Sequence, residues 1–305
     1  MNESYHIPVL LQESVEGLIG NKNGRYVDVT FGGGGHSGAL LQELEEGELL
    51  AFDRDPEAHD NAISDNRFSI VREDFKFLEK VLEEKGWNRV DGILADLGIS
   101  SHQIDTPARG FSHRFDGPLD MRMNPAVGET AADVLNEWEE AELAQMFWRY
   151  GEISNSRKLA RIIVEEREGA RIQSTKQLET LIQSCVPSKR KTKYLSQVFQ
   201  ALRIEVNGEM EGLEHLLVGA MHRLKIGGRL AVIAYHSLED RMVKRFLRSG
   251  NFQDKLEKDL YGRPLTPWKL ITRKAIQPSE AEIQRNSRAR SARLRIAERI
   301  EIRQP

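Results

Sequence analysis

The stretch DVTFGGGGHSG, residues 28–38, decides the fold of this chain. It follows a β-type apolar run and leads into a segment whose Leu40, Leu41 and Leu44 share one helical face. Four consecutive glycines between a strand and a helix make a turn without Cβ atoms, so a ligand can approach the backbone amides where the helix starts. The stretch therefore predicts an α/β unit with a cofactor site at its first turn.

Short apolar runs alternate with helix-length segments on both sides of this turn. This alternation is typical of a parallel sheet whose strands are joined by crossover helices. A later helix is expected to stop at Gly227 and Gly228, just before another strand. We therefore expect a Rossmann-like α/β sheet with strands at residues 26–31, 49–53, 68–72, 90–96, 230–235, 270–276 and 294–300.

The pattern changes between the fourth and fifth of these strands. Residues 100–125 contain many proline and glycine residues and predict a long loop. Residues 130–202 predict helices, beginning with one stretch over 131–151, and Ser174 and Gln177 form a capping-box pattern. The expected domains are a discontinuous sheet domain, residues 1–105 and 201–305, and an insertion of loop and helices, residues 106–200.

Polar and aromatic residues follow the ends of the predicted strands. Asp53 ends the second strand, about twenty residues after the glycines, where a carboxylate can accept both hydroxyls of a ribose. Nicotinamide dinucleotides and S-adenosylmethionine share that ribose, and the glycines also satisfy GxGxxG, so both cofactors remain open. Phe75 follows the third strand and either lines an adenine pocket or packs in the core. Asp96 ends the fourth strand, at the edge where such sheets bind ligands.

Composition and missing motifs narrow the class of protein. The chain has 305 residues, 30% of them charged, and a formal charge of −3, as in an ordinary globular enzyme. Its one cysteine, Cys185, excludes a disulfide framework and a zinc ribbon, and we expect it to serve packing. No P-loop, HExxH or zinc-deaminase pattern is present, and no metal site is expected. Without a signal-peptide pattern or a membrane-length apolar run, the expected location is the cytoplasm.

Basic residues gather in two places. Seven arginines lie between residues 285 and 303, against two glutamates. A second cluster, SKRKTK, contains Lys189, Arg190, Lys191 and Lys193. Both clusters suit a polyanionic partner, and both are equally compatible with solvated helix faces.

Seven stretches distributed over essentially the whole chain carry a family resemblance: TFGGGGHS, AFDRDP, DLGISSHQIDTPARGFS, DGPLDMRM, FQALRIEVN, YHSLEDRMVKRF and NSRARSARLRIAER. They resemble the ribosomal RNA small subunit methyltransferase H family, which methylates the exocyclic N4 of a P-site cytosine in 16S rRNA. The resemblance implies S-adenosylmethionine as cofactor, a Rossmann-like methyltransferase sheet and an inserted helical domain that helps to hold RNA. It implies 16S rRNA within the small ribosomal subunit, or its late precursor, as partner. By position in these motifs, the cofactor-binding residues are Gly34, Gly35, His36, Asp53, Phe75, Asp96 and Gln103.

The expected reaction needs a proton acceptor, because a cytosine amine is a poor nucleophile whose lone pair is delocalised into the ring. An acceptor on its N–H groups would localise that pair and take up a proton as the new bond forms. Asp96 is the first catalytic candidate, although the resemblance also makes it a cofactor contact. His236 is the second candidate, for proton handling or base contact, unless it is a structural histidine.

The sequence departs from the usual amino-methyltransferase motif, in which Pro-Pro and an aromatic follow the acidic residue. Here Leu-Gly-Ile follows Asp96, so the aromatic that stacks on the base must come from elsewhere. Phe111 and the pair Tyr235 and His236 are candidates. Since the amine is reached only on an unpaired or extruded base, the loop 100–125 is expected to close over the target.

Four charged residues of that loop either serve the site or only brace the loop: Arg109, Asp116, Asp120 and Arg122. Two other functions remain open. An NAD(P)-dependent oxidoreductase fits the GxGxxG pattern. However, the chain lacks a second glycine-rich mononucleotide-binding half, and an oxidoreductase would have no use for the arginines at residues 285–303. A non-catalytic ribosome assembly factor would keep the fold without the chemistry. The oligomeric state is not predicted.

Overall fold

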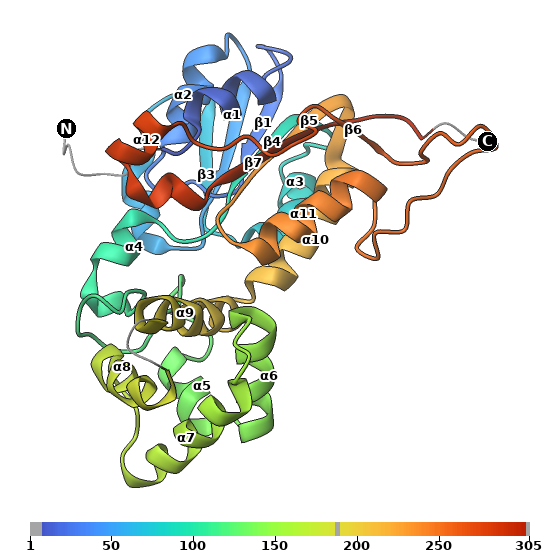
Figure 1. The fold of residues 1–305 in the computed structure, drawn as a ribbon. Helices are drawn as coiled ribbons and strands as arrows, with labels where there is room; N and C mark the ends of the chain where they lie inside the picture. The colour runs from blue at the N-terminus through green and yellow to red at the C-terminus, as the bar shows by residue number, and fades with distance from the viewer. Residues whose placement is uncertain (1–7, 187–189, 303–305) are drawn as a thin grey trace. The chain divides into compact units, whose positions relative to one another are not determined.

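The computed structural model describes residues 8–186 and 190–302 and divides into two compact units (Figure 1). One unit, called here the α/β unit, comprises Met1–Gly98 and Glu211–Pro305, and the other, the helical unit, comprises Ile99–Met210. Each unit has its own apolar core.

The α/β unit is built on a seven-stranded sheet of order β3-β2-β1-β4-β5-β7-β6. The first five strands run parallel, whereas β7 is antiparallel to both of its neighbours. The strands are β1 Arg25–Asp28, β2 Glu48–Phe52, β3 Phe68–Val71, β4 Val90–Asp96, β5 Leu224–Ala234, β6 Trp268–Leu270 and β7 Arg293–Arg299. The expected fold class is therefore correct.

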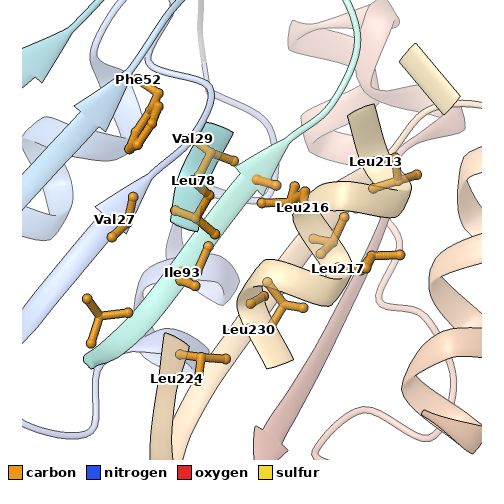
Figure 2. Packing of buried hydrophobic residues seen from close by; sticks show 14 of the residues in the cluster. Val27, Val29, Phe52, Leu78, Ile93, Leu213, Leu216, Leu217, Leu224 and Leu230 are labelled. Atoms are coloured by element: carbon orange, nitrogen blue, oxygen red, sulfur yellow. The ribbon is translucent and has the colours of Figure 1, made fainter. Parts of the chain in front are cut away.

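Helices cover both faces of this sheet (Figure 1). Side chains alternate along each strand, so Val27 and Ile93 pack against α3 and α10 while Tyr26 and Leu94 face α1 and α2. Figure 2 shows the apolar cluster that contains Val27 and Ile93, with the leucines of α10 packed over the strands. The helices of the unit are α1 Leu11–Leu18, α2 Gly35–Glu43, α3 Leu78–Glu84, α10 Glu209–Arg223, α11 Ser237–Ser249 and α12 Glu280–Arg285. Short 3-10 turns are η1 Pro56–Asn61, η2 Phe75–Phe77 and η6 Ser287–Ser291.

Strand β5 is longer than the sequence predicts. It begins at Leu224 rather than at residue 230, although Gly227 has a φ of +84°. Lys225, Ile226 and Gly227 are exposed, and the pairing with β4 shifts register between Val90 and Gly92. The helix expected to stop at Gly227 and Gly228 therefore ends earlier, at Arg223, and the irregularity accommodates Gly227 within the strand.

The helical unit holds α4 Ser101–Asp105, η3 Pro107–Arg109, α5 Ala131–Glu137, α6 Glu140–Gly151, α7 Ser156–Gly169, α8 Thr175–Ile182, η4 Gln183–Cys185 and α9 Lys191–Asn207. The single helix expected over residues 131–151 is wrong, because the chain turns at Trp138 and Glu139 starts a new helix with its own capping box. The capping box of Ser174 and Gln177 is confirmed. Cys185 is buried in the core of this unit, as its expected packing role requires.

The unit boundaries lie at residues 98/99 and 210/211, whereas the sequence placed domain boundaries at 105/106 and 200/201. The second difference has a simple cause, because α9 continues unbroken through residue 200 as far as Asn207. Over the described ranges, the structure contains no helix that is both long enough and apolar enough to cross a membrane.

Candidate active site at the carboxyl edge of the sheet

The carboxyl ends of β2, β1 and β4 bring three predicted features together in the α/β unit. Because β1 lies between β2 and β4, its glycine turn has Asp53 on one side and Asp96 on the other. Ligands of such open sheets bind at this edge. The edge is therefore the candidate active site.

The glycine turn needs its glycines for two reasons. Gly32 and Gly34 have φ values of +52° and +76°, which side chains rarely tolerate. A Cβ atom on Gly34 would also lie 2.9 Å from the Phe31 ring, and one on Gly35 would lie 2.3 Å from the ring of Pro8. Apart from its two chain neighbours, no described residue has an atom within 4 Å of the position of a Cβ on Gly32, so the backbone there is open to a ligand.

Asp53 is held by the turn that it faces. The amide of Gly32 donates to its Oδ2 at 2.8 Å, and the amide of Asp55 donates to its Oδ1 at 2.8 Å. Each carboxylate oxygen keeps a further lone pair for a ligand hydroxyl. Burial raises the pKa of Asp53 to about 6, against the lowering effect of these two amides.

Asp96 sits among three polar partners from other elements. The Tyr235 hydroxyl, just after β5, donates to Oδ1 at 2.8 Å. His36 Nδ1 lies 3.6 Å from Oδ2, and the Asp96 amide donates to the Thr30 hydroxyl at 2.6 Å. Burial, and then the Asp96 charge, raise the pKa of Tyr235 well above its ordinary value, so its hydroxyl remains the donor.

Behind this group lies Asp28, which is fully buried at the end of β1. The Ser37 hydroxyl donates to Asp28 Oδ2 at 2.7 Å, and the Thr30 amide donates to Oδ1 at 3.1 Å. Burial raises the pKa of Asp28. Thr30 thus links Asp28 to Asp96 through its amide and its hydroxyl.

The other predicted cofactor residues of the α/β unit have clear positions. His36, in the first turn of α2, is buried, and its Nε2 lies 3.1 Å from the Val9 carbonyl oxygen. Because a carbonyl only accepts, Nε2 carries a proton. Phe75 begins η2 and packs partly buried at the margin of the core, beside Gly212 of α10.

His236 has a structural task in this site. It is the N-cap of α11, where its ring accepts from the Glu239 amide and its Nε2 lies 3.0 Å from Glu239 Oε1. Glu239 Oε2 accepts in turn from the Tyr235 amide at 2.9 Å. These contacts fix the chain beside Asp96, and a role of His236 in proton handling stays a prediction.

Two predicted residues belong to the helical unit. Gln103 is buried and closes a capping box with Ser100 at the start of α4. Phe111 is 6% exposed and packs within the apolar core of its unit. The hypothesis that Phe111 stacks on a base is therefore wrong, because its ring is already covered.

The charged residues of the loop 100–125 brace that loop. Arg109 donates to the carbonyl oxygens of Arg122 and Met123 at 3.1 and 2.9 Å. Arg122 forms a bidentate pair with Asp120, at 2.9 and 2.7 Å. The Lys176 amide donates to Asp116 at 3.3 Å. The bracing interpretation is thus the correct one for these contacts.

The side chains of the two basic clusters differ in whether they are paired or exposed. Arg295 forms a bidentate pair with Asp240 at 2.7 and 3.1 Å, and Arg299 donates to the Met221 carbonyl oxygen at 3.0 Å. Arg290 and Arg293 are exposed. In the other cluster, Lys191 pairs with Glu179 at 2.8 Å, whereas Lys189, like Arg303, lies outside the described residues.

Sequence reasoning missed the contact between Tyr235 and Asp96, which joins residues 139 positions apart. Tyr235, an aromatic residue at the end of a predicted strand, indicated that this strand end lies near the site. The sequence did not identify Asp96 as its hydrogen-bond partner. The Thr30 hydroxyl was missed as well, because no local pattern marks it as the acceptor for the Asp96 amide.

Comparison with known proteins identifies a methyltransferase family. The profile of the MraW methylase family matches residues 3–300. Two proteins named ribosomal RNA small subunit methyltransferase H, from Bacteroides thetaiotaomicron and Cytophaga hutchinsonii, are each 52% identical over 297 residues. The alignments cover 97% of this chain and 98% and 99% of the relatives. A solved putative methyltransferase from Streptococcus mutans in complex with SAH is 13% identical, with a TM-score of 0.45 over 97% of this chain and 100% of that one.

Proposed function

The chain belongs to the MraW methylase family, and on that premise we propose that it methylates the exocyclic N4 of a cytosine in the RNA of the small ribosomal subunit. The methyl donor is S-adenosylmethionine. The relatives named as small-subunit ribosomal RNA methyltransferases support the substrate class, and the site supports the chemistry.

One observation carries the proposal: the glycine turn lies between Asp53 and Asp96 at a single sheet edge. Such an edge suits a ligand with a ribose at one end and a reactive group at the other. The residues present fit S-adenosylmethionine, because Asp53 keeps free lone pairs for two ribose hydroxyls and the backbone at Gly32 is open. When bound, the cofactor supplies an electrophilic methyl group on a sulfonium.

The remaining cofactor contacts are assigned by position. Gly34 and Gly35 start α2, where backbone amides and the helix dipole favour a carboxylate. Phe75 lies after β3 and would border the adenine. His36 and Gln103 stay proposed contacts, each already held by its own fold.

Asp96 is the proposed proton acceptor for the amine. The Tyr235 hydroxyl on Oδ1 and the His36 ring 3.6 Å from Oδ2 hold this carboxylate in a defined orientation. A positioned carboxylate would localise the lone pair of the amine and hold the proton that leaves it. His236 is the alternative acceptor, and its capping contacts with Glu239 would have to loosen first.

The rival functions make different demands on the chain. Dinucleotide-binding sheets of order 3-2-1-4-5-6 have two mononucleotide halves, whereas this sheet places antiparallel β7 between β5 and β6. This topology argues against an NAD(P)-dependent oxidoreductase. A non-catalytic assembly factor would have no need for an oriented Asp96.

The finer parts of the proposal concern the partner. The substrate is 16S rRNA within the small subunit or its late precursor, met in the cytoplasm. The helical unit is the proposed RNA-recognition domain. Residues 100–125, braced by Arg109 and Arg122, form the segment that would meet the target base.

The test is product identification. Purified protein is incubated with labelled S-adenosylmethionine and undermethylated small-subunit particles, and the digested RNA is examined by mass spectrometry. N4-methylcytidine is expected with wild type and nearly absent with Asp96→Asn. A product methylated at C5 or at the ribose would refute the proposed position, and no transfer with tight particle binding would favour the assembly factor.

A further inference from the structure

A short hairpin displays two large apolar side chains to solvent, in the connection between α11 and β6. Leu260 is 96% exposed and Tyr261 is 85% exposed, more than the other large apolar residues of the described chain. In Figure 1 the chain leaves α11 and makes a long excursion before it returns at β6. The two neighbouring side chains form an exposed apolar patch at the tip, and such patches mark interaction sites when polar residues surround them.

The tip is a built structure. The Asp259 carboxylate accepts from the amides of Tyr261 at 2.9 Å and Arg263 at 2.8 Å. The Asp259 amide donates to the Arg263 carbonyl oxygen at 2.9 Å, and Gly262 takes a φ of +78° to close the turn. The backbone that carries Tyr261 is therefore held in a defined turn, which lowers the entropy cost of binding.

The chemistry around the tip favours a polyanion that carries aromatic faces. The Arg263 guanidinium lies 5.7 Å from the centroid of the Tyr261 ring, and most of the ring stays open. Between residues 244 and 263, six basic residues stand against three acidic ones. Asp259 uses its carboxylate on the backbone of the tip, and Asp254 pairs with Arg248. Exposed tyrosine beside arginine and lysine is the combination that binds unpaired nucleotides, by stacking and phosphate contact.

The hairpin stands away from the candidate active site. Tyr235 and His236 lie at the start of α11, a helix of 13 residues, whereas the hairpin comes after the end of this helix. Phe252 packs on Phe246 with ring centroids 4.8 Å apart, so the chain stays near the end of the helix as it enters the excursion. At 1.5 Å per residue, α11 separates the two places by roughly 20 Å.

We propose that this hairpin is a second RNA-binding element, in which Tyr261 stacks on an unpaired base of the substrate RNA and Arg263 and Lys258 contact phosphates. The inference rests on the proposed function, because it takes the substrate to be a folded RNA. The contact lies outside the methylated nucleotide, so it contributes to affinity for the particle and leaves the chemical step alone.

The test compares variants in steady-state methylation of small-subunit particles, with particle binding measured alongside. Tyr261→Ala should raise KM about five- to one-hundred-fold, the range for losing one stacked base, with an unchanged rate at saturation. Tyr261→Phe should retain the wild-type KM, since the ring does the stacking. Ile226→Ala, an equally simple truncation of an apolar side chain that is 62% exposed on β5, should change nothing.

Three results separate the possibilities. Wild-type kinetics in Tyr261→Ala would overturn the hairpin proposal while the proposed function stands. A Leu260→Ser variant as damaging as Tyr261→Ala, with a KM insensitive to salt, would overturn it in favour of an apolar protein contact. If wild type transfers no methyl group, the proposed function fails, and weaker particle binding by Tyr261→Ala would still support the hairpin.

Discussion

The two units bury polar side chains for different purposes. In the α/β unit, buried Asp28, Ser37 and His36 gather at the sheet edge that holds Asp96: the Ser37 hydroxyl donates to Asp28, and the His36 ring lies between Asp96 Oδ2 and the Val9 carbonyl oxygen. In the helical unit, Arg109 and Thr175 donate to backbone carbonyl oxygens of nearby loops. Grouped side chains leave acceptor capacity for a ligand, whereas side chains bonded to backbone hold the chain in place. Burial alone therefore does not mark a site, and the kind of partner does.

The largest effect is expected for Asp96→Asn. Asparagine keeps the shape of the side chain and one acceptor oxygen, but it cannot take up positive charge that develops on the amine. We expect single-turnover methylation at saturating cofactor to slow by about 10²–10⁴-fold, the usual range for a proton acceptor. Cofactor affinity, measured by calorimetry, should change far less.

Tyr235→Phe is the matched control, because it removes only the hydroxyl that orients Asp96. It should slow the same step less than Asp96→Asn does. If Asp96→Asn keeps its rate while cofactor affinity collapses, Asp96 serves the cofactor, and His236 becomes the acceptor to test.

Arg109→Ala, in the helical unit, should lower the stability of the fold rather than the rate of the chemical step. The variant leaves two carbonyl acceptors without their guanidinium donor inside a buried site, at a cost of about 2–3 kcal/mol in the free energy of unfolding. Urea denaturation measures this loss, with Arg114→Ala, an exposed arginine of the same loop, as control. Unchanged stability together with lost turnover would mean that Arg109 serves catalysis.

Asp53→Ala should weaken cofactor binding while the fold stays intact. A charged acceptor for ribose hydroxyls contributes about 1.5–3 kcal/mol, which corresponds to roughly 10- to 150-fold in Kd. Calorimetric titration with S-adenosylmethionine measures the change, and circular dichroism checks the fold. If the folded variant has the same Kd as wild type, Asp53 does not contact the cofactor and only accepts hydrogen bonds from the Gly32 and Asp55 amides.

The raised pKa of Asp53 predicts a pH dependence with a defined sign. Below a pKa of about 6 the protonated acid replaces the carboxylate, so cofactor affinity should fall as the pH drops through 6, by at most about tenfold per unit. The stability contribution has the opposite sign, since burial favours the protonated form: it is full below the unfolded pKa near 3.8 and is lost as the pH rises through 6. Asp53→Asn should flatten the affinity profile, and a wild-type Kd constant from pH 5 to 7 would contradict this assignment.

The smallest effect concerns salt. Arg290 and Arg293 are exposed, whereas Arg295 is paired with Asp240. Replacing Arg290 and Arg293 with glutamate should flatten the salt dependence of particle binding by about one unit of slope per lost phosphate contact. Lys193→Glu makes the same comparison on the helical unit. Equal slopes in all variants would assign these charges to solvated surface.

The sequence allowed the sheet and its ligand edge to be predicted, because strand ends and glycines are local features. Asp53 and Asp96 could be placed at one edge because each ends a strand of a sheet expected to be parallel. The hydrogen bond from Tyr235 to Asp96 could not, because it joins two strand ends far apart in the chain and depends on side-chain direction. The end of α5 at Trp138 was also hidden, since the apolar pattern continues across it and only the cap at Glu139 marks the new helix.

The position of β7 has a consequence for the order of folding. β6 precedes β7 in the chain, yet among the described strands it pairs with β7 alone. It therefore has no place in the sheet until the later strand has docked on β5, across a loop of nearly sixty residues whose closure is slow. Substitutions in β6 should consequently speed unfolding with little effect on the folding rate, which marks this edge as one of the last parts of the molecule to form.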